Sequence, residues 1–398
     1  MEIGVQPAHI LQTLWGRISG RRDLVSSHLL ECGKHFSLGR FFRRRYILDT
    51  NLLFQNYTKK QIYIVSTDFE RTLMSAESNL AGMFPPGRTS SGVRWVGEHW
   101  QPIPIHTRPV SQDKVFAIRR KKCPHLDQLK KQLEESNPYG QVEAEHKKLI
   151  DYLADKSGMK ATVPDIAQLY DIFFCQKQNN LTQYWPEWMN NTMFRTLKEF
   201  QDKVVTVSHS VPEINRFLGG PIVARMVKNM KTRLEDKESP LRMYMFSAHD
   251  TTVSALLSAL QVFNPTVNPP YISCVMVELY QRADNSSYVQ VYFRNDSTGQ
   301  IPPHKLHIPG CASSDCEFSN FLEVTKSLSL PEADLKRECN KKVFPNTTSI
   351  TILILAVLLM VVILISISYF YLRRRKATRY EEYRLTNRQA DDDDEEDP

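Results

Sequence analysis

Apolar and polar positions alternate along this chain in two rhythms, one helical and one strand-like. Apolar residues recur at helical spacing from about Leu29 to Tyr46, whereas short apolar runs at 61–66 and 242–247 predict strands. Each of these strands leads through a polar turn into a helical pattern, at 70–83 and at 251–262. Repeated strand–turn–helix units are typical of an α/β protein.

The region from about 120 to 240 is rich in charge and predominantly helical. Its helical stretches lie near 126–136, 142–156, 192–207 and 221–234. Beyond it, two alternating segments around 275–294 predict an antiparallel hairpin that turns at Asp284-Asn285, and 318–327 predicts a last helix. We expect an α/β fold in which a mixed sheet is flanked by helices and a smaller helical cap domain, about 120–240, is inserted.

One segment near the C-terminus is apolar throughout. Residues Ile350 to Leu372 carry no charge over 23 residues, long enough for a helix that crosses a hydrocarbon core of about 30 Å. A buried core helix is the alternative, but it would be shorter and less uniformly apolar. The basic run 373–376 follows at once, so we expect a cytoplasmic tail, 373–398, and a luminal or extracellular domain, 29–340.

The first 28 residues differ from the rest of the chain. They contain no apolar run of the length that a signal peptide needs. A luminal domain, however, requires a signal peptide. Their Arg-rich, acid-poor character resembles a mitochondrial transit peptide. We favour the hypothesis that the N-terminus is incomplete or arises from an alternative start. A tail-anchored protein that faces the cytosol is a further alternative, which glycans at Asn180 or Asn285 would exclude.

Composition and charge narrow the function. With 398 residues, of which 41% are apolar, the chain supports a sizeable core in one large domain or two small ones. The net charge of +7 is concentrated at the ends, because the first 45 residues are basic and the last eight hold seven acids. A balanced middle argues against nucleic-acid binding. We interpret the tail as solvated and acidic, although Tyr380 and Tyr383 leave a sorting signal open.

The cysteines and glycosylation motifs agree with a luminal domain. Seven cysteines precede the apolar segment, no C-x-x-C pair suggests a metal, and three disulfides with one spare thiol are the simplest account. Cys311 and Cys316 are near enough to close a small loop. Six N-x-S/T motifs begin at Asn56, Asn180, Asn190, Asn285, Asn295 and Asn346. We expect no metal and no cofactor.

The candidate chemistry lies in the two turns that follow the predicted strands. The first turn holds Asp68 and Arg71, and the second holds His249 and Asp250. Ligands of open α/β sheets bind at the carboxyl ends of strands, where helix N-termini favour anions. From spacing alone, the alternative is two capped turns, with Asp68 and Asp250 as N-caps and Arg71 in a surface ion pair.

Several motifs in the same order resemble the histidine acid phosphatases, in particular their membrane-anchored lysosomal and prostatic forms. They are "STDFERTLMSAESNLAGMFPP", "WQPIPIHT", "SAHDTTVSALLSAL" and "IPGCASSDC". The resemblance runs from about Leu29 to Cys339. It implies an α/β domain with a helical cap, phosphomonoester substrates and a possible homodimer.

The resemblance also assigns roles by motif. Arg71 and His249 would bind the phosphate, and Asp250 would donate a proton to the leaving alcohol. It implies the disulfides Cys123–Cys339, Cys175–Cys274 and Cys311–Cys316, with Cys32 spare.

One family motif has no match in this sequence. The family's nucleophile is a histidine in "R-H-G-x-R-x-P" on a first strand, and no R-H-G occurs here. His9 and His28 have no flanking arginine or glycine. The leading hypothesis is an acid phosphatase held in a lysosomal or plasma membrane. The alternative is a catalytically inactive isoform or a phosphate-binding membrane glycoprotein.

Overall fold

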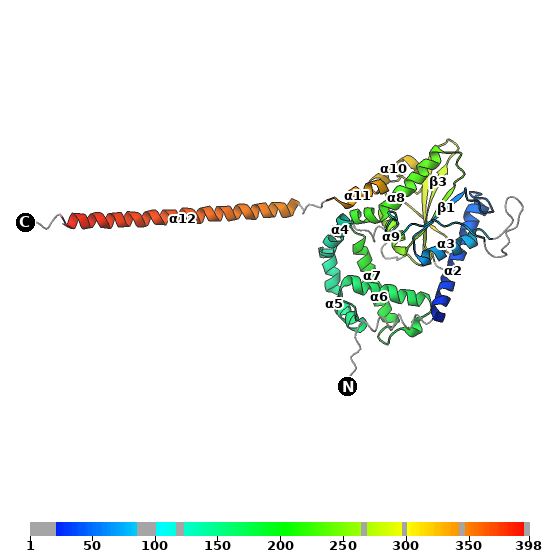
Figure 1. Cartoon of the computed structure of the whole chain (residues 1–398), viewed down its shortest axis with the longest axis horizontal. Helices are drawn as coiled ribbons and strands as arrows, with labels where there is room; N and C mark the ends of the chain where they lie inside the picture. Colours follow the sequence, from blue (N-terminus) through cyan, green and yellow to red (C-terminus); the bar gives the residue numbers. More distant parts are fainter. Residues whose placement is uncertain are drawn as a thin grey trace, which may run out of the picture. The chain divides into compact units, whose positions relative to one another are not determined.

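The computed structural model describes residues 21–85, 101–116, 123–263, 269–296, 301–341 and 347–393. The chain divides into two compact units, Met1–Lys341 and Lys342–Pro398 (Figure 1). The helices of the first unit are α2 (Arg21–Arg43), the π-helical η1 (Arg44–Asp49), α3 (Glu70–Met83), α4 (Pro124–Glu134), α5 (Asn137–Ser157), α6 (Val163–Gln178), the 3-10 helix η3 (Thr182–Tyr184), α7 (Asn191–Ser208), α8 (Pro212–Glu235), α9 (Asp250–Ala259), α10 (Phe318–Lys326) and α11 (Glu332–Cys339).

The strands of this unit form two sheets in the described part of the chain. They are β1 (Ile62–Ser66), β2 (Met243–Ser247), β3 (Cys274–Gln281), β4 (Ser287–Arg294), β5 (His304–Leu306) and β6 (Cys316–Glu317). β1 and β2 pair in parallel, whereas β3, β4 and β5 form an antiparallel sheet in which β4 also pairs with β6. The expected α/β class with flanking helices is confirmed, and parallel and antiparallel pairs lie in separate sheets.

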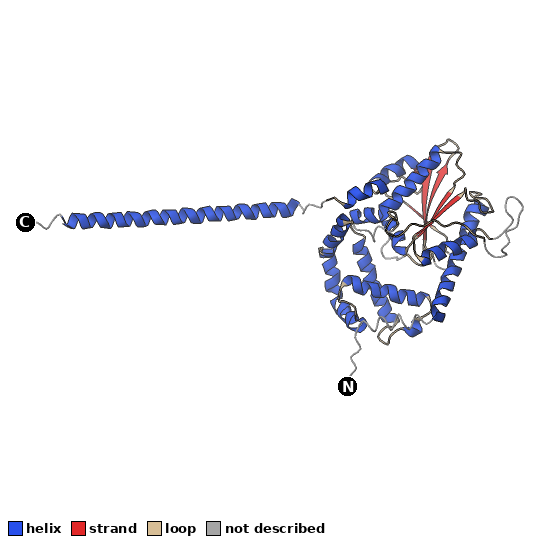
Figure 2. Ribbon diagram, viewed as in Figure 1, coloured by secondary structure: helices blue, strands red, loops and turns tan. Residues whose placement is uncertain are grey.

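Helices α5, α6 and α7 form a part of the unit that contains no strand (Figure 2). Their apolar faces share one core cluster, in which Leu153, Ile166, Leu197 and Phe200 are fully buried. α6 was absent from the sequence-based elements. Its buried residues, among them Ile166, Tyr170 and Phe173, recur at helical spacing, so the pattern was present in the sequence and was overlooked.

α8 packs closely on α9, the helix that begins in the second turn. A side chain at Gly219 would collide with the carbonyl oxygen of Ala255, so only glycine allows this approach. The helix begins at Pro212 and continues through Pro221 in its interior. The sequence-based start at 221 was wrong because Gly219, Gly220 and Pro221 favour a break locally, and tertiary packing overrides that preference.

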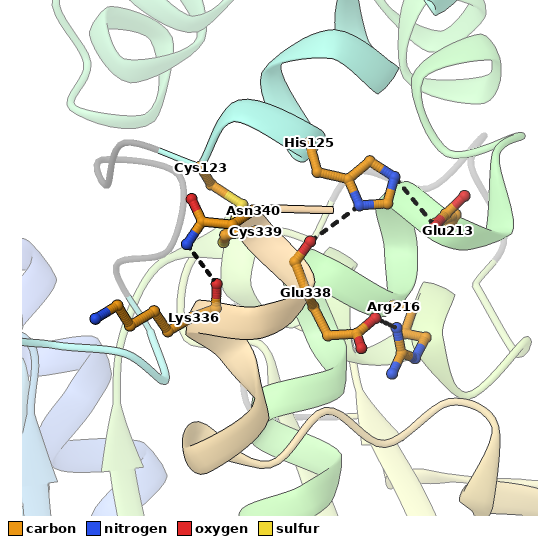
Figure 3. The surroundings of a disulfide bond; sticks show 8 residues. All are labelled: Cys123, His125, Glu213, Arg216, Lys336, Glu338, Cys339 and Asn340. Carbon is orange, nitrogen blue, oxygen red and sulfur yellow. Dashed lines mark hydrogen bonds and ion pairs between the residues drawn. A yellow bond between two sulfur atoms is a disulfide. The ribbon is translucent and has the colours of Figure 1, made fainter. Parts of the chain in front are cut away.

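The end of the first unit is tied to its helical part by a disulfide between Cys123 and Cys339 (Figure 3). Beside it, the His125 ring contacts the Glu338 carbonyl oxygen at 3.1 Å and the Glu213 carboxylate at 3.3 Å. The Glu338 side chain accepts hydrogen bonds from nearby cations, which lower the pKa of its carboxyl below the ordinary value. The chain segment that leaves this unit is thereby fixed to α4 and α8.

The second unit contains one long helix, α12 (Thr347–Asp393). Among the described residues, one segment is long and apolar enough to cross a membrane, Ile354–Glu381, with a mean hydropathy of 2.7. It overlaps the apolar segment expected from the sequence, Ile350 to Leu372. None of it is buried against other parts of the protein.

Candidate active site

The two predicted turns lie side by side at one edge of the parallel sheet. Ser66 and Ser247 are register partners at the last positions of β1 and β2. The Thr67 amide donates to the Ser247 carbonyl at 3.0 Å, and the Ser247 hydroxyl donates to the Thr72 carbonyl at 2.8 Å. These bonds fix the start of α3 against the end of β2. The turn after β1 and the turn after β2 therefore lie next to each other.

Arg71 and His249 are in direct contact. The Arg71 Nη2 atom lies 3.1 Å from the His249 Nδ1 atom, and the Thr67 Oγ1 atom lies 3.2 Å from Nε2. A guanidinium has only donors, so Nδ1 must accept and the proton must sit on Nε2, which donates to Thr67. This arrangement pairs the His249 ring, as a hydrogen-bond acceptor, with a permanent positive charge.

The Phe69 ring contacts the side chains of both His249 and Arg71. Its ring meets the His249 ring edge-to-face at 5.1 Å, and the Arg71 guanidinium carbon lies 4.8 Å from its centroid. Edge-to-face and cation–π contacts of this kind restrict the orientation of both polar groups. Arg71 is exposed and His249 is half-buried, so their polar faces remain open to an incoming molecule.

Asp250 begins α9, directly after its N-cap residue, His249. The Asp250 Oδ1 atom accepts the Thr251 amide at 2.7 Å, and the His249 amide donates to the Thr252 hydroxyl at 3.3 Å. The alternative in which Asp68 and Asp250 are N-caps is wrong, because Phe69 and His249 occupy those positions. Asp250 is exposed and lines the same cavity as Arg71 and His249.

A second carboxylate faces this group from the helical part. Asp171, on α6, lines the same cavity as Arg71, His249 and Asp250. Desolvation, together with the negative charge of Asp250, raises the pKa of Asp171, and Arg71 opposes the shift. Sequence reasoning missed Asp171 because α6 itself was unassigned, and it missed Thr67 because a hydroxyl group in the first turn carries no charge that would single it out.

Arg71, Asp171, His249 and Asp250 line one cavity of about 1010 Å³. Its volume is at the upper end of the range for small-molecule sites. Apart from the turns, its walls come from α2, from α8 and from the two strands β2 and β3. Among the described residues, no cluster of three His, Cys, Asp or Glu side chains is arranged to bind a metal ion.

Two of the three expected disulfides are present, Cys123–Cys339 and Cys311–Cys316. The third, Cys175–Cys274, is not formed, and Cys32 is also free. The Tyr271 hydroxyl donates to the Cys175 sulfur at 3.1 Å. Burial raises the pKa of the Cys175 thiol to about 11 and that of Cys274 to about 12. Both sulfurs therefore sit in the cavity wall as protonated thiols.

The glycosylation motifs lie mostly on the surface. Asn56, Asn180, Asn190 and Asn285 are exposed and Asn295 is half-buried, whereas Asn346 lies outside the described residues. The Asn190 side-chain oxygen caps α7 by accepting the amides of Thr192 and Met193. That bond uses the oxygen and leaves the amide nitrogen available, so capping and glycosylation are compatible. Attachment of glycans stays a prediction.

Comparison with known proteins identifies relatives over most of the chain. The model of the histidine phosphatase superfamily (branch 2) matches residues 33–294. The human lysosomal acid phosphatase is 33% identical over 327 residues, which cover 81% of this chain and 74% of the relative. The rat prostatic acid phosphatase is 37% identical over 314 residues, which cover 77% of this chain and 78% of the relative.

Solved structures share the fold at low sequence identity. The phytase of Klebsiella sp. ASR1 superposes with a TM-score of 0.58 at 16% identity, covering 80% of this chain and 88% of that protein. The phytase of Citrobacter braakii gives a TM-score of 0.55 at 17% identity. These likenesses support the fold alone. The expected resemblance to histidine acid phosphatases is confirmed by the family model and the closer relatives.

Proposed function

The chain belongs to the histidine phosphatase superfamily, and on that basis we propose that it hydrolyses phosphate monoesters at acidic pH. The acid phosphatases of the lysosome and prostate are relatives at 33% and 37% identity. The observation that carries the proposal is the contact between Arg71 and His249 at the paired N-termini of α3 and α9. The positive dipole ends of two helices converge there.

Arg71 supplies the permanent charge of this anion site. Its Nη2 atom contacts His249 and its guanidinium carbon lies over the Phe69 ring, and because Arg71 is exposed its other donors are accessible to an anion. A planar fork of donors matches the geometry of a phosphate better than an ammonium does. When a phosphate monoester binds, mostly as a monoanion at acidic pH, uptake of a solvent proton at His249 Nδ1 would replace the Arg71 bond by a second cationic contact to the anion.

Asp250 is the proposed proton donor to the leaving alcohol. It is exposed to the cavity and follows His249 directly, so an ester oxygen bound by His249 and Arg71 would be close to its carboxyl. In that role the protonated carboxyl transfers its proton to the alcohol oxygen as water attacks phosphorus and the P–O bond breaks, so the alcohol leaves neutral and the phosphoryl group leaves as inorganic phosphate. Burial and the negative charge of Asp250 raise the pKa of Asp171, which lies across the cavity.

A second candidate function is phosphate binding without turnover. It is favoured by one observation, that this sequence contains no R-H-G motif to supply the family's phosphorylated histidine. Loss of a covalent nucleophile commonly reduces turnover by about 10⁴ to 10⁶. The anion site formed by Arg71 and His249 does not depend on that motif, so binding persists under either function.

Leaving-group dependence tests the role of Asp250. The full chain is assayed at about pH 5 with 4-nitrophenyl phosphate, whose leaving group needs little protonation, and with ethyl phosphate, which needs it fully. We expect Asp250→Asn to lower the ethyl phosphate rate about 100-fold more than the aryl rate. Asp68→Asn, an exposed carboxylate in the first turn, is the matched control.

Each outcome of this assay is informative. Equal losses on both substrates for Asp250→Asn would remove Asp250 as the proton donor. Phosphate binding with no measurable turnover of either substrate by the unmodified chain would support the second candidate. Activity that is the same in Asp250→Asn and in the unmodified chain on both substrates would contradict the site assignment.

We also propose that the phosphatase domain is anchored in a lysosomal or plasma membrane and faces the lumen or cell exterior. The apolar part of α12 and the basic residues Arg373 to Lys376 support this orientation. Treatment of the cell-derived protein with an endoglycosidase tests it, with Asn180→Gln and Asn285→Gln as the variants. A mobility shift lost in the variants is expected, and an unshifted protein would favour the cytosol-facing alternative.

A further inference from the structure

The cavity beside the anion site separates the edges of the two sheets. All five residues of β2 and all eight residues of β3 line it. In the described part of the chain, β2 pairs with β1 alone and β3 pairs with β4 alone. One long edge of each strand thus borders the same open space.

The backbone of both strands presents hydrogen-bonding groups to that space. Met243 and Ser247 bond toward β1, through the Met243 amide and the Ser247 carbonyl. Because bonding direction alternates along a strand, the amides and carbonyls of Tyr244 and Phe246 point to the other edge. Likewise the Arg282 amide, directly after β3, donates to the Ser286 carbonyl, directly before β4. Every second residue of β3, counted back from Arg282, therefore bonds toward β4. The residues between them direct their amides and carbonyls to the cavity.

Apolar side chains of β3 pack on both faces of its sheet. Val275, Val277 and Leu279 of β3 pack with a cluster that includes Ile222 and Leu256. The residues that alternate with them along β3, Cys274 and Met276, pack with a second apolar cluster.

That second cluster lies on the opposite face and also receives β2. It contains Met243 and Met245 together with Leu38 and Phe42 of α2. Every residue of β2 is only half-buried, although four of the five are apolar. Two apolar clusters therefore meet across an open slot that is bordered by backbone donors and acceptors.

We propose that this slot binds an extended polypeptide segment as an additional strand between β2 and β3. Backbone groups of the segment would pair with both edges, as in the recognition of peptides by strand addition. A strand whose faces are both covered is continuously apolar, so the segment carries a run of Val, Ile or Leu at least as long as β2. The added strand would lie about 4.8 Å from each neighbour and form backbone hydrogen bonds to both. A small apolar molecule would form none of these bonds.

The segment comes from outside this sequence. The stretches that flank or interrupt the described residues contain no more than two successive apolar residues. A second copy of the chain carries the same stretches and offers nothing better. The slot ends at Ser247 and His249, so a bound strand would place its terminal residues beside the anion site. The proposal does not depend on the phosphatase activity, since it rests on strand edges alone.

Peptide binding and hydrogen exchange test the slot directly. The full chain in lipid nanodiscs is titrated with the fluorescent peptide Lys-Lys-Val-Ile-Val-Val-Ile-Lys-Lys. The control peptide has proline in place of the central valine, which removes a donor and cannot sit in a central strand. We expect the proline peptide to bind at least about 100-fold more weakly. Backbone amides of Tyr244, Phe246 and Val277 should become protected only with the first peptide.

Two matched variants separate the slot from the rest of the core. Val277→Lys places a charge in the slot, whereas Val262→Lys places the same charge in the same apolar cluster but outside the cavity lining. We expect loss of peptide binding in the first and retention in the second. If both variants misfold, the exchange data on the unmodified chain still decide.

Three results would overturn the proposal. They are no binding of the Val-Ile peptide, equal binding of both peptides, and binding without protection of β2 and β3. Binding of the Val-Ile peptide with protection at one strand alone would also contradict a bridging strand.

Discussion

A single carboxylate holds the π-helical turn η1 against the antiparallel sheet. Glu278 of β3 accepts hydrogen bonds from the Nε and Nη2 atoms of Arg45 at 2.8 Å and from the hydroxyls of Tyr46 and Tyr280 at 2.6 Å. Its side chain is 10% exposed and that of Arg45 is 25% exposed. All lone pairs that a buried carboxylate must satisfy are therefore occupied.

Replacing Glu278 by alanine leaves the Arg45 charge in a partly buried site without its partner. Breaking a buried pair in this way commonly costs about 3 to 5 kcal/mol. Because Arg45 keeps some contact with water and stacks on the Tyr292 ring at 4.6 Å, we expect the lower end, about 3 kcal/mol. Removing both charges with Glu278→Ala and Arg45→Met should restore most of the loss.

Urea unfolding of the full chain, followed by tryptophan fluorescence, measures this effect. The matched control is Glu145→Ala, which breaks a pair with Lys203 at the same 2.8 Å distance but on the open surface. We expect a small change in midpoint for the control, since exposed pairs contribute little. Equal midpoints for Glu278→Ala and Glu145→Ala would refute the reasoning.

The same carboxylate predicts a pH dependence. Burial works to raise the pKa of Glu278, but the hydrogen bonds from Arg45, Tyr280 and Tyr46 outweigh it and lower the pKa below its ordinary value of 4.5. The stabilisation is thus complete above pH 4.5 and is lost as the pH falls through the lower folded-state value. Glu278→Gln should flatten the unfolding midpoint in that acidic range.

Three further predictions concern stability and binding. Burial lowers the pKa of His35 from 6.5 to about 4, so the domain should lose about 2 kcal/mol between pH 7 and pH 5, and His35→Gln should reduce that loss in thermal melts at both pH values. The bond Cys123–Cys339 closes a loop of 216 residues, so the double alanine variant should be less stable by about 2 to 5 kcal/mol in urea. Arg71→Lys keeps the charge but loses the planar fork, so competition assays with inorganic phosphate should show binding weakened about 10-fold or more.

Local patterns were enough to predict the elements that carry the site. The helix at 70–83 and the strands at 61–66 and 242–247 agree with α3, β1 and β2 within one residue. In each case an apolar run ends at a polar turn, so the signal is local. β5, β6 and α11 were missed because they are short and gain their stability from contacts with distant segments.

The candidate site was predictable only in part. Arg71 and His249 were expected to meet because parallel strands end at one edge, and the structure places them 3.1 Å apart. Asp171 was not predictable, since it reaches the site from α6, about 100 residues beyond the first turn, through the packing of the helical part. The absent Cys175–Cys274 bond also depends on such packing, as the hydroxyl of Tyr271 occupies the Cys175 sulfur.

Phosphate binding by the unmodified chain tests the central claim most directly. Inorganic phosphate is titrated calorimetrically into the full chain at about pH 5, with Arg71→Ala as the test variant and Arg242→Ala, which lines the same cavity, as the control. A hydrogen bond to a charged group contributes about 1.5 to 3 kcal/mol, so we expect Arg71→Ala to weaken binding about 10- to 150-fold and Arg242→Ala to leave it unchanged. Unaltered phosphate affinity in Arg71→Ala would contradict an anion site at the turns of β1 and β2.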